Sequence, residues 1–99
     1  MSDEAFPQAS RTEIAARLRV TRQAFGMGQY DFADRAGIAG NTYNQYEQAK
    51  KRPTIENALA LCRAYGLTLD WVYAGDPSGL PYKVADAIKS IKILHGGQE

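Results

Sequence analysis

The chain has 99 residues, of which 44% are hydrophobic and 23% charged, and a formal net charge of +1, values typical of one small globular domain. Its single cysteine and single histidine exclude an internal disulfide and a metal site built from those residues, and no plausible catalytic set is visible. No apolar run reaches the roughly 18 residues of a membrane span. We therefore expect a cytoplasmic protein that is not an enzyme, needs no cofactor and does not bind a membrane.

Apolar residues recur at helical spacing along most of the chain, and no segment alternates as a strand would. The pattern predicts a flexible N-terminal arm over 1–10, five short helices between 11 and 75, a linker over 76–80, a C-terminal amphipathic helix over 81–94 and a tail over 95–99. Glycine, which tolerates the left-handed conformation that ends many helices, stands at four of the predicted helix ends. The predicted fold is all-α, a compact five-helix bundle with an additional C-terminal helix.

The first predicted helix places its apolar residues at i, i+4, i+7 and i+11, which is one helical face: Ile14, Leu18, Thr21 and Phe25. The second is expected over 29–36 and the third over 40–49. Thr54 can cap the fourth, whose predicted apolar face is Ile55, Ala58, Leu59, Cys62 and Tyr65. The fifth covers the short segment LDWVYA.

Only about three residues around Gly37 separate the second and third helices, which is the layout of a helix-turn-helix pair. In such a pair the second helix enters the DNA major groove. Tyr43 and Tyr46 share one face of the third helix, and we expect both in the core. The rest of that helix carries side-chain amides, at Asn41, Asn44, Gln45 and Gln48. Because an amide can bond adenine at N6 and N7 together, this face is suited to contact bases.

Positive charge is concentrated around these two helices. Residues 11–52 contain eight basic and four acidic side chains and so carry +4, although the whole chain carries only +1. Three of the basic residues, at 50–52, directly follow the third helix. A local excess of this kind points to a nucleic-acid or acidic partner.

The segment RLRVTRQAFGMGQYDFADRAGIAGNTYNQYEQAKKRPTIENALALCRAYGLTLDWVYAG resembles the helix-turn-helix domain of phage repressors, Cro proteins and their bacterial relatives, the xenobiotic-response-element type. The resemblance rests on Arg22, Gly26, Gln29, Phe32-Ala33, Ala36-Gly37-Ile38, Tyr43, Tyr46-Glu47, the basic run before Pro53, and LTLDWVYAG. It implies a lambda-repressor-like bundle that binds double-stranded DNA.

The resemblance also implies a role for each matching position. Base-reading positions are Gly40, Asn41, Asn44 and Gln45, and phosphate-binding positions are Gln29, Thr42, Lys50, Lys51 and Arg52. Arg22 and Glu47 match a pair that forms a buried salt bridge in relatives. The main-chain N–H of Gln29, near a helix N-terminus, is likewise well placed for an anion.

Three positions depart from the family pattern. Relatives usually place Ser or Thr at position 39 and Ser or Asn at position 28 as helix caps, where this chain has Ala39 and Gly28. Gly40 puts no side chain at the first base-reading position. Two alternatives are open for Asn41: it either caps a third helix that starts one residue late, or it contacts a base.

The C-terminal helix carries an apolar stripe at Val84, Ile88, Ile91 and Leu94. The stripe either folds back on its own bundle or pairs with a second copy, and we favour a homodimer because small DNA-binding domains of this type occupy two half-sites. We interpret the protein as a sequence-specific transcriptional regulator, a repressor on a palindromic operator. The alternative is a protein-interaction module, such as an antitoxin whose C-terminal helix binds a partner protein.

Overall fold

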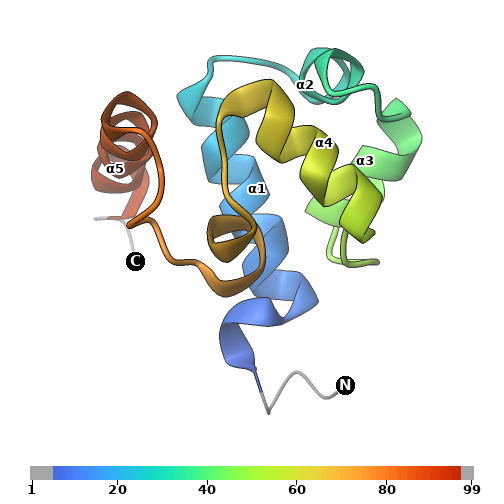
Figure 1. The fold of residues 1–99 in the computed structure, drawn as a ribbon, viewed down its shortest axis with the longest axis horizontal. Coiled ribbons are helices and arrows are strands. Elements are labelled where there is room, and N and C mark those ends of the chain that lie inside the picture. The colour runs from blue at the N-terminus through green and yellow to red at the C-terminus, as the bar shows by residue number, and fades with distance from the viewer. Residues whose placement is uncertain (1–5, 97–99) are drawn as a thin grey trace.

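The computed structural model describes the backbone of residues 6–96 and the side chains of residues 6–92. The elements are the 3-10 helix η1 (Pro7–Ala9), α1 (Arg11–Ala24), α2 (Gln29–Arg35), α3 (Gly40–Glu47), α4 (Ile55–Tyr65), the short π-helical turn η2 (Asp70–Ala74) and α5 (Tyr82–Gly96), as Figure 1 shows. No strand occurs within the described range, so the predicted all-α fold is confirmed. None of the described helices is long and apolar enough to cross a bilayer.

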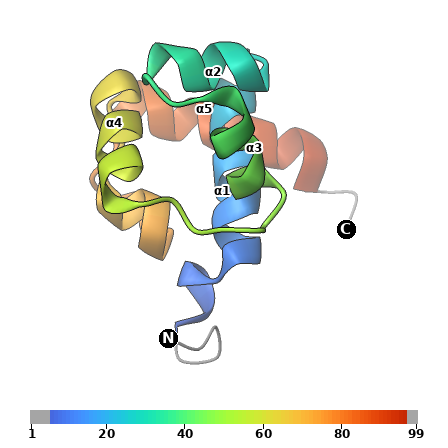
Figure 2. The same cartoon turned by 90° about the vertical axis from the view of Figure 1, so that its right-hand side faces the viewer.

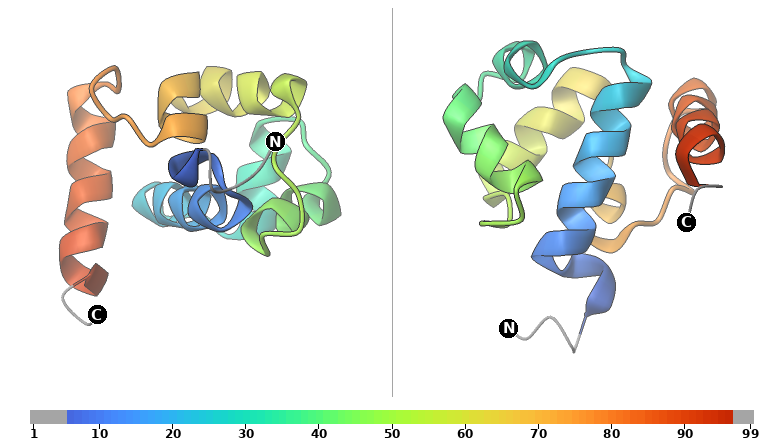
Figure 3. Two further views of the ribbon diagram at one scale, coloured as in Figure 1. Left: turned by 90° about the horizontal axis from the view of Figure 1, so that it is seen from below. Right: turned by 180° about the vertical axis from the view of Figure 1, so that it is seen from behind.

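Helix α1 lies in the middle of the molecule. Helices α2, α3 and α4 lie on one of its sides and α5 on the other, which is visible from the front in Figure 1 and from behind in Figure 3. Helix α1 contacts both α3 and α5, and α2 contacts α3. The last turns of α5 extend past α1 (Figure 2). The α2–α3 pair therefore lies on the side of the bundle opposite α5.

The core between these helices is rich in aromatic rings with polar tips. The rings of Phe32 and Tyr65 stack with their centroids 4.1 Å apart, and Tyr43 and Tyr46 are 0% and 2% exposed. Their hydroxyls have partners inside the protein: Tyr65 donates to the carbonyl of Phe32 at 2.6 Å, and Tyr46 accepts from Asn57 Nδ2 at 2.8 Å. Since a buried hydroxyl without a partner destabilises a protein, these bonds allow tyrosine to serve as a core residue.

The predicted flexible arm over 1–10 is wrong for its last residues. Residues 7–9 form η1, and two arginines from other parts of the chain hold it. The guanidinium of Arg17 donates to the carbonyl of Gln8, and Arg52 Nε donates to the carbonyl of Ala9 at 2.6 Å. The local sequence does not encode these tertiary bonds, so the arm looked unstructured. Residues 1–5 lie outside the described range.

The predicted apolar face of the fourth helix is wrong at two positions. Helix α4 buries Ala58, Leu61 and Tyr65, which follow one another at helical spacing. Ile55 and Leu59 are 50% and 48% exposed. Leu61 rather than Leu59 enters the core. The buried face of α4 is therefore rotated about the helix axis relative to the predicted one.

The predicted linker and C-terminal helix are part of the same core. Leu80 is 8% exposed and Ile88 4% exposed, and Lys92 Nζ lies 5.4 Å from the ring centre of Trp71. Val84 and Ile91 are half-buried, and the side chain of Leu94 lies outside the described residues. This packing corresponds to the alternative in which the stripe folds back on its own bundle. Homodimerisation stays a prediction, and Ile88 is already used inside the chain.

Helix α3 ends at Glu47, two residues earlier than predicted, because Ala49 takes a left-handed conformation with φ of 61°. This conformation costs a residue with a Cβ roughly 1–2 kcal/mol. Ala49→Gly removes that cost. Glycine also makes the unfolded chain more flexible, which destabilises the folded state by about 0.5–1 kcal/mol. We expect this variant to raise the free energy of unfolding in urea titrations by up to ~1 kcal/mol.

The matched control is Ala16→Gly, which makes the same change at an exposed position inside α1. There the backbone is already helical, so glycine should destabilise the protein by about 0.5–1 kcal/mol. A loss of stability in both variants would contradict the strain at Ala49.

Candidate nucleic-acid interface

The turn between α2 and α3 is tight and held by main-chain bonds. Gly37 has φ of 75°, a left-handed conformation that glycine adopts without steric cost. The N–H groups of Gly37 and Ile38 donate back to the carbonyls of Asp34 and Ala33, both at 2.9 Å. Ile38 is 5% exposed and anchors the turn in the core. These bonds determine where α3 starts relative to α2.

Helix α3 presents two different faces. Tyr43, Tyr46 and Glu47 are buried. Asn41 and Gln48 are exposed, and Gly40, Thr42, Asn44 and Gln45 are half-buried. The amides at 41, 44, 45 and 48 follow the i, i+3, i+4, i+7 spacing of a single helical stripe. The structure therefore brings the predicted base-reading residues together on the outward side of α3.

The N-terminus of α3 excludes one of the two alternatives for Asn41, its role as a helix cap. The helix begins at Gly40, with Ala39 in the N-cap position and no side-chain cap hydrogen bond. Asn41 is the second residue of the helix, two positions after the N-cap, and its side chain is exposed. The expectation of a helix that starts one residue late is wrong, because the extended backbone of Ala39 leads directly into Gly40.

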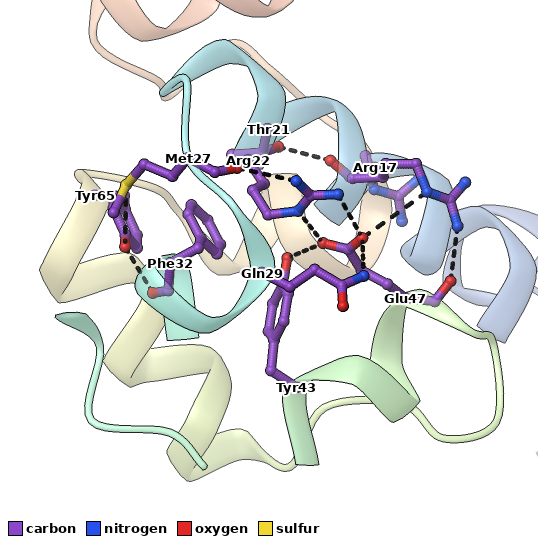
Figure 4. A network of polar contacts seen from close by, with 10 residues as sticks. Arg17, Thr21, Arg22, Met27, Gln29, Phe32, Tyr43, Glu47 and Tyr65 are labelled. Carbon is purple, nitrogen blue, oxygen red and sulfur yellow. Dashed lines mark hydrogen bonds and ion pairs between the residues drawn. The ribbon is translucent and has the colours of Figure 1, made fainter. Parts of the chain in front are cut away.

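The buried carboxylate of Glu47, 1% exposed, joins three helices (Figure 4). Arg22 of α1 binds it through two nitrogens, with Nε at 2.7 Å and Nη2 at 3.0 Å. Tyr43 donates its hydroxyl to the same carboxylate at 2.5 Å, and Gln29 of α2 donates its amide at 3.0 Å. Arg22 also donates to the carbonyl of Met27 at 2.9 Å, in the loop before α2. This network connects α1, the α2 N-terminus and α3.

The network keeps its members in defined charge states. Burial acts to raise the pKa of Glu47, but the hydrogen bonds from Arg22, Tyr43 and Gln29 outweigh it and hold that pKa below its ordinary value of 4.5. Burial, with the hydrogen bond to Glu47, raises the pKa of Tyr43, so its hydroxyl stays protonated and donating. The hydrogen bond to Glu47 raises the pKa of Arg22. At neutral pH the group is an ion pair with a neutral phenol.

The predicted phosphate-binding residues differ in their exposure and in the hydrogen bonds that they already make inside the protein. Lys50 and Lys51 are exposed on the loop after α3. Arg52 is half-buried and uses Nε to hold η1. The side-chain amide of Gln29 donates to Glu47. The group that Gln29 can offer to a phosphate is therefore its main-chain N–H, which has no partner within the helix because it lies in the first turn of α2.

Two residues near this surface were absent from the predicted site. Arg19 donates to the main-chain carbonyl of Glu47 at 2.8 Å, which ties α1 to the end of α3. Tyr30 is 71% exposed on α2 and lies beside Gly40. The sequence offers one indication for Tyr30: it is an aromatic residue of α2 that is not part of the apolar side formed by Phe32 and Ala33. Among the described residues, no three His, Cys, Asp or Glu side chains gather into a possible metal site.

The helix-turn-helix family model matches residues 18–72, which is more than half of the chain and includes α2, the turn and α3. This chain belongs to the helix-turn-helix family. It is a DNA-binding domain of the Cro and repressor type, as the resemblance implied. No solved structure matches the chain at a comparable level of significance.

Curated relatives belong to the same class. An uncharacterised helix-turn-helix-type transcriptional regulator, YobD of Bacillus subtilis, is 32% identical over 57% of this chain and 50% of its own length. The cryptic phage CTXphi transcriptional repressor RstR of Vibrio cholerae is 24% identical over 82% of this chain and 73% of its own length. A second RstR, from a serotype O1 strain, is 33% identical over 59% of this chain and 52% of its own length. The chain thus spans about half the length of two of these relatives.

The Glu47 network generates a prediction about stability and pH. Glu47→Gln should lower the free energy of unfolding at neutral pH by about 3–5 kcal/mol, because it leaves the charge of Arg22 uncompensated. Because the folded-state pKa of Glu47 lies below 4.5, its ionised form stabilises the native state above that pH, and this contribution is lost as the pH falls through the folded-state pKa. Urea titrations should show the difference in the free energy of unfolding between wild type and variant narrowing as the pH falls below 4.5.

The control is Asp86→Asn, which neutralises an exposed carboxylate on α5. Its effect should stay within about 0.5 kcal/mol at each pH. Equal stability of wild type and Glu47→Gln at neutral pH would contradict the structural role of the network.

Proposed function

We propose that this protein is a transcriptional repressor that binds a palindromic DNA operator as a homodimer, with α3 of each copy in the major groove. The observation that carries the proposal is the outward amide stripe of α3, which lies on a helix anchored by Glu47 and next to two exposed lysines. Asn41, Asn44 and Gln45 suit base contact because an amide can donate and accept in one plane.

The phosphate contacts come from groups around the recognition helix. Thr42 lies at the third position of α3, and the loop lysines Lys50 and Lys51 follow its C-terminal end. The main-chain N–H of Gln29 and the guanidinium of Arg52 complete the proposed set. Contacts of this kind position the protein on DNA, and the amides supply the sequence preference.

The homodimer follows from the size of the interface. One recognition helix of eight residues buries too little surface for tight, specific binding alone, whereas two copies can occupy half-sites about one helical turn apart. We assign the contact to α5, whose last turns extend past the bundle (Figure 2). Val84 and Ile91 are only half-buried, and together with Leu94 they form the proposed contact. Repression is supported by the name of the relatives that are phage repressors.

Selection of bound sequences from a random duplex pool tests the proposal. The wild type should enrich one palindromic consensus, and Asn44→Ala with Gln45→Ala should relax the choice at the positions they contact. Each lost contact should cost about 1–3 kcal/mol of discrimination. The melting temperature should change little, because Asn44 and Gln45 are only half-buried. A consensus with a single half-site would count against the dimer.

Gln23→Ala provides the matched control, since it removes an exposed amide from α1. It should enrich the wild-type consensus. If the double variant also enriched that consensus without loss, Asn44 and Gln45 would not contact bases.

Lys50→Ala with Lys51→Ala should weaken binding to all duplexes alike. The slope of log K against log salt should become flatter by about 1–2, which fluorescence titrations at several salt concentrations would measure. Lys83→Ala with Lys89→Ala removes the same charge from exposed positions of α5 and should leave the slope nearly unchanged. Wild-type binding that is indifferent to salt would instead indicate a protein-interaction module.

A further inference from the structure

Gly40 leaves a gap in the proposed DNA interface, since the first residue of α3 has no side chain. Its backbone does not require glycine. The residues with positive φ in the described chain are Gly26, Gly37, Ala49, Gly66 and Gly75, and Gly40 is not among them. Glycine also weakens a helix relative to alanine. A reason for glycine at this position must therefore come from its surroundings.

The surroundings of Gly40 consist of the ring of Tyr30. A Cβ atom at position 40 would lie 2.1 Å from Cδ1 and 2.3 Å from Cε1 of Tyr30, far closer than two non-bonded carbon atoms can approach. The ring therefore occupies the space where the side chain of residue 40 would begin. Tyr30 in this position and any side chain at position 40 exclude each other.

Tyr30 does not behave like the structural tyrosines of this protein. It is 71% exposed, so its ring gains little from burial. Its hydroxyl has no hydrogen bond within residues 6–92, whereas the hydroxyls of Tyr43, Tyr46, Tyr65 and Tyr73 each have a partner. Tyr30 thus leaves both a flat ring surface and a phenol available beside the first turn of α3.

We propose that Tyr30 is a specificity-determining DNA contact, whose ring replaces the missing side chain of Gly40 at the first base-reading position. The inference rests on the proposed function, since the N-terminal residues of α3 carry whatever is packed against them into the groove. An aromatic ring contacts the C5-methyl group of thymine, as other apolar side chains do. Tyr30 therefore selects thymine at one position of each half-site, from α2 rather than from the recognition helix.

The test is a double-variant cycle on the full chain, with Tyr30→Ala, Gly40→Ala and the two together. Each is taken through duplex selection and then competition binding with duplexes changed at single positions. Tyr30→Ala should lose the preference for thymine at one position by roughly 5- to 150-fold, the discrimination that one mismatched base pair typically costs. Gly40→Ala should lose it at the same position, because the new methyl group displaces the ring. The double variant should be no worse than either single one, since both remove the same contact.

Three controls separate this contact from other effects. Tyr30→Phe keeps the ring and should keep the thymine preference. Tyr82→Ala removes another exposed tyrosine, 82% exposed on α5, and should enrich the wild-type consensus. Thermal unfolding of Gly40→Ala should match or exceed that of the wild type, because the ring it displaces is at the surface and can move.

The outcomes distinguish this inference from the proposed function. If the wild type enriches a consensus and Tyr30→Ala enriches the same one with unchanged preference at every position, the inference is overturned and the proposed function stands. Losses spread evenly over all positions, or additive losses at different positions for the two single variants, would also overturn it. If the wild type enriches no sequence, both the function and the inference fail.

Discussion

The buried carboxylate of Glu47 is the constraint on which the arrangement of this protein depends. A charge removed from water is tolerated only when its oxygens are fully bonded, and here the donors are Arg22 of α1, Gln29 of α2 and Tyr43 of α3 itself. Three helices must therefore meet at one point and at one angle. Because α3 is only eight residues long and has no side-chain cap, this network rather than intrinsic helix propensity holds it in place.

The aromatic core of the bundle likewise buries polar groups whose hydrogen bonds are made inside the protein. Tyr43 and Tyr46 are almost fully buried, and the hydroxyl of each binds a polar side chain at the edge of the core. Both tyrosines and Glu47 point into the core. The side-chain amides of α3 therefore lie on the outer side of the helix. On the other side of α1, the cations of Arg17 and Lys92 lie 5.9 Å and 5.4 Å from the ring centre of Trp71. The contact with Lys92 joins α5 to the rest of the bundle.

Much of the fold could be predicted, because local patterns encode it. Helix limits followed from caps and glycines: Thr54 accepts from the main-chain N–H of Asn57, and Gly66 ends α4 in a left-handed conformation. The turn at Gly37 and the amide stripe could be predicted for the same reason. The errors arose where long-range contacts decide. Leu61 replaces Leu59 in the core, and η1 forms because arginines distant in the chain bind its carbonyls.

The sequence by itself determined which segments are helical, which of them form the helix-turn-helix, and which residue types α3 carries on its outer face, since caps, turns and periodicity are local properties. Only the tertiary structure decided that Asn41 does not cap α3, that the amide of Gln29 serves Glu47, and that Ile88 lies in its own core. It alone placed Tyr30 over Gly40. The physical reason is that periodicity defines the faces of each helix, whereas contacts between helices depend on crossing angles that packing and buried charge determine together.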